Sequence, residues 1–281
     1  MKKQNILLTI LFIIAIISII FAIYKIYKPN NSNKNNIENI NVSTSIEKNI
    51  SNFEEKDFLD KNDFYEISAK YPIDSFDKEK DIETFVLHII KEKQKEWKIG
   101  GEVYNSEKET EKDFPDRPKM TYSLDISFDK YSSKEKGTVS YLFNIYEFTG
   151  GAHGINAINT FTFNKNGKVD IQDILDLSSG DNAIKLSRVL ADNLKTKGGD
   201  MIEENMMMEG LGLAYLKVDG KTFDNVKCAC DGFNFASNFQ NFYITDEGMN
   251  FVFSQYQIAP GAAGIIKTLI DWNTLSPYIL K

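Results

Sequence analysis

The chain has 281 residues, of which 33 are Lys or Arg and 40 are Asp or Glu, so its net charge at neutral pH is −7. The phosphate backbone of nucleic acids repels such a chain, which argues against nucleic-acid binding. An acidic surface attracts cationic proteins, peptides or divalent ions instead. Arg117 and Arg188 are the only arginines, so few groups are available for forked recognition of phosphate or carboxylate.

The chain opens with an apolar stretch, Ile6–Tyr24. It holds 19 residues without a charge, close to the ~20 that a helix needs to cross a bilayer. Apolar cores of signal peptides are shorter, usually ~7–15 residues, and a small-residue cleavage site follows them, which we do not find after this stretch. We therefore expect residues 1–28 to be a short cytoplasmic tail and one transmembrane anchor. The predicted location is the cell membrane, with a single span and the large remainder outside the cell.

A polar segment at residues 29–50 follows the anchor. Asn30–Asn41 holds seven asparagines in twelve residues, a composition that cannot bury enough apolar surface to fold. We interpret residues 29–50 as a tether. Residues 1–28 contain four lysines and no acidic residue, so the remainder carries 29 basic against 40 acidic residues, a net charge of −11.

The next part, residues 51–148, has the patterns of one helix and two strands. Apolar residues recur every three or four positions from Asp81 to about Lys95, which predicts an amphipathic helix with His88 at its boundary. The stretches at residues 120–133 and 137–148 are rich in β-branched and aromatic residues, which favours strands. We treat residues 51–148 as an N-terminal α+β part.

A glycine loop, Thr149–Gly154, then separates the second strand from a predicted hairpin at residues 158–171. This hairpin contains Asn166-Gly167, the strongest short hairpin signal, because both turn positions are expected to need a positive φ. One of only two histidines in the chain, His153, stands in the loop.

The remaining residues repeat the pattern of a helix beside strands. Apolar residues at helical spacing run from Ile184 to Leu194, preceded by several candidates for an N-cap at residues 178–181 and followed by Gly198. A methionine-rich stretch, residues 201–208, lacks His and Cys and is interpreted as core filler or a mobile segment. The sequence pattern of residues 241–258 predicts strands. The fold class is therefore α+β, with helices packed on antiparallel sheets after the anchor, and residues 149–281 form its C-terminal part.

The chemistry that His153 could carry is limited by its surroundings in the sequence. A metal site would need partners such as Asp173, Cys228 or Cys230, but no paired ligand spacing is present. Nucleophilic catalysis would need a serine or cysteine in a known context, and none is found. We therefore expect no metal, no cofactor and no enzymatic activity, with a cell-wall hydrolase using His153 as the alternative. Whether Cys228 and Cys230 are bonded or free stays open.

Two motifs carry a resemblance to a known family. "YEFTGGAHG" followed by "NGK" and "VDIQDILDL", and "FYITDEGMNFVFSQYQIAPGAAG" near the carboxyl end, are similar to the extracytoplasmic domain of RsiV-type anti-sigma factors. That domain also occurs beside the catalytic domain of some peptidoglycan deacetylases. The resemblance implies an α+β domain without catalysis, and in the best-known member it recognises lysozyme. This chain departs from the family in having five residues instead of a cytoplasmic arm, and in Gly261, where relatives often have an aromatic residue.

These observations predict a membrane-anchored, extracytoplasmic binding or sensing module of a Gram-positive cell envelope. Its expected partners are the membrane, through the N-terminal helix, and lysozyme, another cationic protein or a wall component. We expect the "GGAHG" and "APGAAG" loops to lie near the ends of neighbouring strands of the C-terminal sheet, with His153 partly buried and bonded to loop backbone. Tyr256 and Pro260 would flank a shallow groove. The predicted ligand-binding residues are Gly150, Gly151, His153, Gly154, Tyr256 and Pro260.

Overall fold

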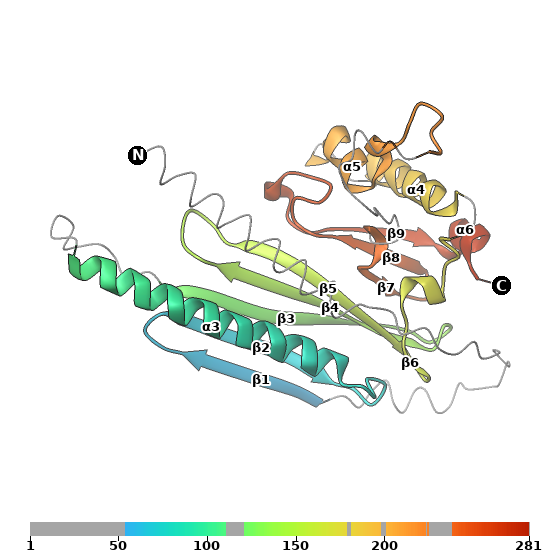
Figure 1. Ribbon diagram of the computed structural model, residues 1–281. Helices are drawn as coiled ribbons and strands as arrows, with labels where there is room; N and C mark the ends of the chain where they lie inside the picture. The colour runs from blue at the N-terminus through green and yellow to red at the C-terminus, as the bar shows by residue number, and fades with distance from the viewer. Residues whose placement is uncertain are drawn as a thin grey trace. The chain divides into compact units, whose positions relative to one another are not determined.

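The computed structural model describes residues 54–110, 121–178, 181–197, 201–222, 224 and 238–280, without the side chains of residues 104–110 (Figure 1). All of these residues belong to one compact unit that spans Val42–Lys281. The expected anchor at residues 1–28, the tether, Cys228 and Cys230 lie outside the described residues. Within the described part, no helix has the length and apolar character needed to cross a membrane.

The larger layer is a six-stranded sheet in which the strands follow one another in chain order. Its strands are β1 Glu54–Lys61, β2 Tyr65–Ile73, β3 Tyr122–Ser133, β4 Thr138–Phe148, β5 Ile155–Asn164 and β6 Gly167–Lys168. Every pair is antiparallel except β2 and β3, which are parallel. The prediction of purely antiparallel sheets is therefore wrong at this pair. A helix connects β2 to β3, and such a crossover returns the chain in the same direction.

Helix α3, Asp81–Thr110, makes this crossover and covers one face of the larger sheet (Figure 1). It begins at the predicted residue, where the Asp77 carboxylate accepts the backbone N–H groups of Asp81 and Ile82 at 2.8 and 3.0 Å. It runs beyond the predicted end near Lys95, through two glycines. The Phe64 ring lies so close to Gly101 that an added Cβ would be 2.2 Å from it. Here the glycine serves packing and does not end the helix.

The core under α3 is rich in aromatic side chains. Phe85 from the helix packs edge-on against Phe143 and Phe161 of the sheet, with ring centroids 6.1 and 5.3 Å apart. Trp97, 2% exposed, lies 6.0 Å from Tyr65. His88 is half-buried at the boundary of the helix, as predicted. Burial of these large rings is what fixes the long helix on the sheet.

Strands β4 and β5 pair along nearly their whole lengths, and a short hairpin follows β5. The larger sheet continues across residue 148, so the expected boundary between an N-terminal and a C-terminal part does not coincide with a break in the structure. The hairpin after β5 turns at residues 165 and 166, because Asn164 pairs with Gly167. Gly167 has a φ of 126° and already belongs to β6, so it takes the positive φ just after the turn.

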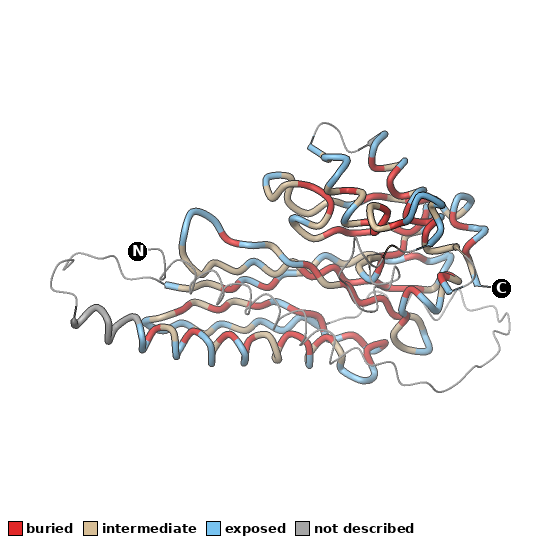
Figure 2. Tube along the Cα trace, turned by 45° about the horizontal axis from the view of Figure 1, so that its top comes forward, coloured by how far each residue is buried: buried red, intermediate tan, exposed pale blue. Residues whose placement is uncertain are grey.

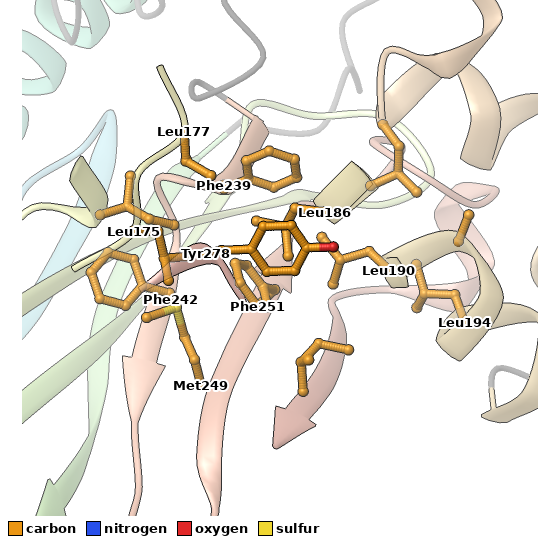
Figure 3. Close-up of a cluster of buried hydrophobic side chains, with 14 of the residues drawn as sticks. Leu175, Leu177, Leu186, Leu190, Leu194, Phe239, Phe242, Met249, Phe251 and Tyr278 are labelled. Carbon is orange, nitrogen blue, oxygen red and sulfur yellow. The ribbon is translucent and has the colours of Figure 1, made fainter. Parts of the chain in front are cut away.

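The second layer is a three-stranded antiparallel sheet with helices beside it (Figure 1). It consists of α4 Asn182–Lys197, α5 Glu204–Gly210, β7 Phe242–Ile244, β8 Gly248–Phe253, β9 Ile266–Asp271 and α6 Trp272–Leu275. Helix α4 begins directly after Asp181, within the predicted capping segment. Met207 is fully buried and Met208 packs against the core, as expected of core filler, whereas Met201 is 59% exposed. Figure 3 shows this core, where leucines of α4 lie beside Phe251, Met249 and Tyr278.

One end of the larger sheet packs directly against β7 and β8. We call this contact the inter-sheet junction; its apolar residues are Leu142, Ile158, Tyr243 and Val252, with Tyr131 packed against them. The rings of Tyr131 and Tyr243 stack 3.7 Å apart, and burial raises the pKa of Tyr243 to about 12.

Two buried hydroxyls in the junction satisfy the backbone of β7. The Ile244 N–H donates to Ser140 Oγ at 3.2 Å, and the Phe242 N–H donates to Thr160 Oγ1 at 3.0 Å. Because the junction covers only part of the larger sheet, β4 is buried on both faces from Thr138 to Phe143 and more open from Asn144 onward. Figure 2 shows this change of burial along the long strands.

Candidate functional site

The more open end of β4 leads into the first predicted loop, Thr149–Gly154. Gly150 and Gly151 have φ angles of 95° and 97°, which disfavour any residue with a Cβ. Gly154 is buried, and a Cβ there would lie 2.5 Å from the Tyr146 ring and 2.6 Å from the carbonyl oxygen of Glu147. Two glycines therefore provide the turn, and the third lets the returning chain pass close beneath Tyr146.

The base of this loop is fixed from the helix side. Lys93 of α3, only 7% exposed, places its Nζ 2.5 Å from Glu147 Oε1 and 3.1 Å from Glu96 Oε2. On the opposite face of β4, Tyr146 is 38% exposed and stands directly across from Asp125 of β3. The loop thus begins from a rigid strand end that carries an exposed ring and a neighbouring carboxylate.

His153 differs in one respect from its prediction. Its Nδ1 lies 3.0 Å from the carbonyl oxygen of Gly154, so the predicted bond to loop backbone is confirmed. The residue is exposed, however, and not partly buried. The reason is that Gly154, and not the histidine, occupies the buried position against β4.

The second predicted loop, Ala259–Gly264, lies in the connection of residues 254–265 between β8 and β9. Tyr256 has a φ of 68° and is 50% exposed, with its ring lying against Gly261. A Cβ at Gly261 would come within 2.2 Å of that ring. Pro260, half-buried, precedes a short 3₁₀ turn at Gly261–Ala263. The Tyr256 ring therefore fills the space that a side chain at position 261 would need. This explains why a glycine stands at that position.

Gln255 of the second loop bonds to the start of β5, directly after the first loop. Its Oε1 accepts the backbone N–H of Asn156 at 2.9 Å, just after the first loop, and its Nε2 donates to the carbonyl oxygen of Gly261 at 2.8 Å. The expectation that the loops lie close together is met, but the expected sheet is wrong, because the first loop leaves the larger sheet and the second leaves the smaller one. We call residues 149–154 and 254–265, bridged by Gln255, the glycine-loop pair. A groove beside Tyr256 and Pro260 stays a prediction.

Three contributors to this site were not predicted from the sequence. These are Gln255, Tyr146 and Lys93, whose contacts are described above. Nothing in their sequence context distinguishes them from other polar or aromatic residues. A glutamine directly before a predicted loop is too common a pattern to indicate a bridge. In the described part of the chain, no three His, Cys, Asp or Glu side chains are grouped as metal ligands would be.

Comparison with known families divides the chain at this site. The family model described as Deacetylase PdaC matches residues 59–156, and the model described as a protein of unknown function, DUF3298, matches residues 187–273. The first loop lies in the first match and the second loop in the other. The bond from Asn156 to Gln255 therefore links the two matched segments. No curated protein matches the chain.

One solved structure shows a similar fold. A DUF3298 family member from Bacteroides fragilis is 18% identical, with a TM-score of 0.54 over 82% of this chain and 94% of that one. A DUF3298 family protein from Pseudomonas aeruginosa is 13% identical, with a TM-score of 0.44 over 82% and 95%. The resemblance to RsiV-type proteins stays a prediction. The chain is similar to PdaC in its first matched segment and to DUF3298 in its second, and it shares the fold of the Bacteroides protein.

Proposed function

We propose that the chain is a membrane-anchored, extracytoplasmic and non-catalytic binding or sensing module of a Gram-positive cell envelope. In this proposal the glycine-loop pair contacts lysozyme, another cationic protein or a wall component. The observation that carries the proposal is the Gln255 bridge, which fixes the loop of Tyr256 to the start of β5, two residues after the loop of the exposed His153. Loops held on rigid strands commonly carry binding surfaces, and exposed tyrosines are frequent anchors of protein interfaces.

Charge favours a cationic partner over a neutral one. The chain has a net charge of −7, and Asp125 stands beside Tyr146 at the base of the first loop. Opposite charges raise the rate of encounter, and salt screens this effect over about 10 Å at 0.1 M. Binding to such a partner should therefore weaken as the salt concentration rises.

The geometry of His153 supports a non-catalytic role. A catalytic histidine needs a hydroxyl, thiol or water to activate and usually a carboxylate that orients it. In the described part of the chain, the bond recorded for His153 is to the carbonyl of the next residue. This arrangement stabilises a turn and supplies an exposed ring for contact.

Binding of lysozyme to the full-length chain in mild detergent tests the proposal. We expect measurable binding that high salt weakens, and about tenfold weaker binding for Tyr256→Ala. Leu280→Ala, which shortens an exposed side chain at the carboxyl end, is the control and should bind like the parent chain. Binding that ignores Tyr256→Ala, or no binding to either lysozyme or purified peptidoglycan, contradicts the proposal. Protease added to intact cells should remove the domain if it lies outside.

The alternative is a cell-wall hydrolase that uses His153, since the imidazole is exposed and accessible. This activity would release soluble muropeptides from purified peptidoglycan, and His153→Ala would abolish the release. If neither the parent chain nor His153→Ala releases muropeptides, and the two have the same thermal stability, the binding module is the better explanation.

A further inference from the structure

Strand β1 forms one edge of the larger sheet and pairs on its inner side with β2 (Figure 1). Its register joins Lys61 to Glu66, and the turn beyond it is closed by the Asn62 N–H donating to Tyr65 O at 2.9 Å. In an antiparallel ladder, alternate residues direct their N–H and C=O groups to the partner strand. Counting back from Asn62, the backbone groups of residues 55, 57, 59 and 61 point away from β2, toward the outer edge.

The side chains of β1 are also divided between two faces. Three residues face α3: Lys56 Nζ lies 2.5 Å from Glu83 Oε1, Phe58 packs against the core, and Asp60 Oδ2 accepts Gln94 Nε2 at 2.5 Å. Glu55, Asp57, Leu59 and Lys61 face the other way. Leu59 is 71% exposed, the largest exposure of any large apolar side chain that the structure describes in the two sheets. The edge therefore combines an exposed leucine with charges of both signs, of which Lys61 also pairs with Glu66 and Glu55 with Lys70 of β2.

The order of charges along β1 allows two antiparallel copies of this strand to attract each other. When two copies pair antiparallel with Phe58 opposite its own copy, Glu55 stands across from Lys61 of the second copy and Lys56 across from its Asp60. Two-fold symmetry produces each attractive pair twice. The outward backbone groups of the odd-numbered residues then meet one another, as an antiparallel ladder requires.

Neighbouring registers lose this match. Centring the pair on Asp57 places Glu54 across from Asp60 of the second copy and puts two Asp57 carboxylates together. Centring it on Leu59 leaves one attractive pair, Asp57 with Lys61, and sets Phe58 against Asp60. Opposite charges across two strands stabilise by roughly 0.2–1 kcal/mol per pair, and like charges destabilise. The charges thus select the register centred on Phe58.

We propose that the outer edge of β1 binds the β1 edge of a second copy of this chain, in the register centred on Phe58, so that two larger sheets become one continuous sheet. Charged edge strands often prevent such pairing. Here the charges attract in the two-fold arrangement, and Leu59 and its copy become diagonal neighbours on one face. The interface is small, so the dimer should be weak and depend on protein concentration.

Disulfide crosslinking of the full-length chain tests the register directly. Opposed residues of a pair without ladder bonds have Cα atoms about 4.5 Å apart, within the range of a disulfide. In a chain with Cys228→Ser and Cys230→Ser, Phe58→Cys should give a covalent dimer under mild oxidation. Asp57→Cys and Leu59→Cys are the matched controls and should give little. Crosslinking that is stronger at either control position overturns the proposed register.

Phe58 packs against the core, so Phe58→Cys could disturb folding. Variants that keep Phe58 test the same dimer without this complication. Lys61→Glu should weaken the dimer about tenfold, because two attractive pairs become repulsive, and Glu55→Lys in the same chain should restore it. Leu59→Pro should abolish the dimer without unfolding the monomer, since its N–H points outward. The measurement is the mass in solution over a wide concentration range. A parent chain that stays monomeric throughout, or a dimer that survives Leu59→Pro, overturns the proposal.

Discussion

Two of the contacts that join the smaller sheet to the larger one in the described part of the chain differ in kind. The inter-sheet junction is apolar and buried, with Leu142 fully covered and the N–H groups of β7 bonded to Ser140 and Thr160. The glycine-loop pair is joined by one side chain, Gln255, and leaves His153 and Tyr256 exposed. The inter-sheet junction therefore stabilises the packing of the two sheets, whereas the glycine-loop pair leaves side chains available for binding.

This difference follows from where the smaller sheet ends. Strand β4 is long enough to extend beyond the cover that β7 and β8 provide, so its first half is core and its second half is only partly buried. A contact that buries apolar area contributes on the order of 25 cal/mol per Å², whereas a hydrogen bond between partly exposed groups replaces bonds to water. We expect mutations in the two contacts to have very different effects.

The largest effect is expected for Leu142→Ala in the inter-sheet junction. Removing a fully buried leucine leaves a cavity and should lower the free energy of unfolding by about 2–5 kcal/mol. Urea unfolding can be followed by Trp97 and Trp272, the two tryptophans of the chain, which report on the larger and smaller sheets. Variants with one tryptophan replaced by phenylalanine assign the signals. A loss under 1 kcal/mol would mean that the junction does not hold the sheets together.

A smaller effect is expected for Gln255→Ala in the glycine-loop pair. The Asn156 N–H and the Gly261 carbonyl lose their partner but remain accessible to water, so the free energy of unfolding should fall by only about 0.5–1.5 kcal/mol. Amide hydrogen exchange at Asn156 should become faster. The matched control is Gln257→Ala, which removes the bond that its Oε1 accepts from Ser254 N within the same loop. If Gln257→Ala speeds amide hydrogen exchange at Asn156 as much as Gln255→Ala does, Gln255 is not the bridge.

The smallest effect concerns pH at the border of the inter-sheet junction. Asp246 accepts Ser133 Oγ at 2.6 Å and the Glu135 N–H at 3.2 Å, and the bond from Ser133 is the main reason that its pKa lies below the usual 3.8. A lowered carboxyl pKa contributes stability that is present above the unfolded value and is lost as the pH falls through the folded value.

Asp246→Asn should therefore make stability slightly less dependent on pH below about 4. Unfolding by urea at pH 6 and at pH 3 measures this difference, with Glu247→Gln as the control at the next residue. An equal drop in stability between the two pH values for the parent chain and Asp246→Asn would show that the carboxylate does not contribute.

Local patterns in the sequence were sufficient for the elements that carry them. Helical spacing located α4 and the beginning of α3, and the β-branched runs located β3, β4 and β8, because periodicity reports which face of an element is buried. Glycines marked both loops correctly, since a positive φ or a close backbone approach is a local requirement. By contrast, β1, β2 and β9 were not identified as strands. Charges interrupt the pattern of β1, whereas β2 alternates Tyr65, Ile67, Ala69 and Tyr71 with polar residues and its strand signal was missed.

Relations between distant residues were decided by the tertiary structure. The parallel pairing of β2 with β3, the exposure of His153 and the bridge from Gln255 to Asn156 all depend on how far α3, β4 and the smaller sheet reach in space. No local pattern contains that information, because a glutamine before a turn has the same sequence signal whether or not an N–H lies within reach. The sequence by itself determined α4, the beginning of α3, strands β3, β4 and β8 and the glycine turns, through backbone preference and burial. Only the packing of two sheets decided which of these turns meet, because contact between residues 99 positions apart is a property of the assembled layers.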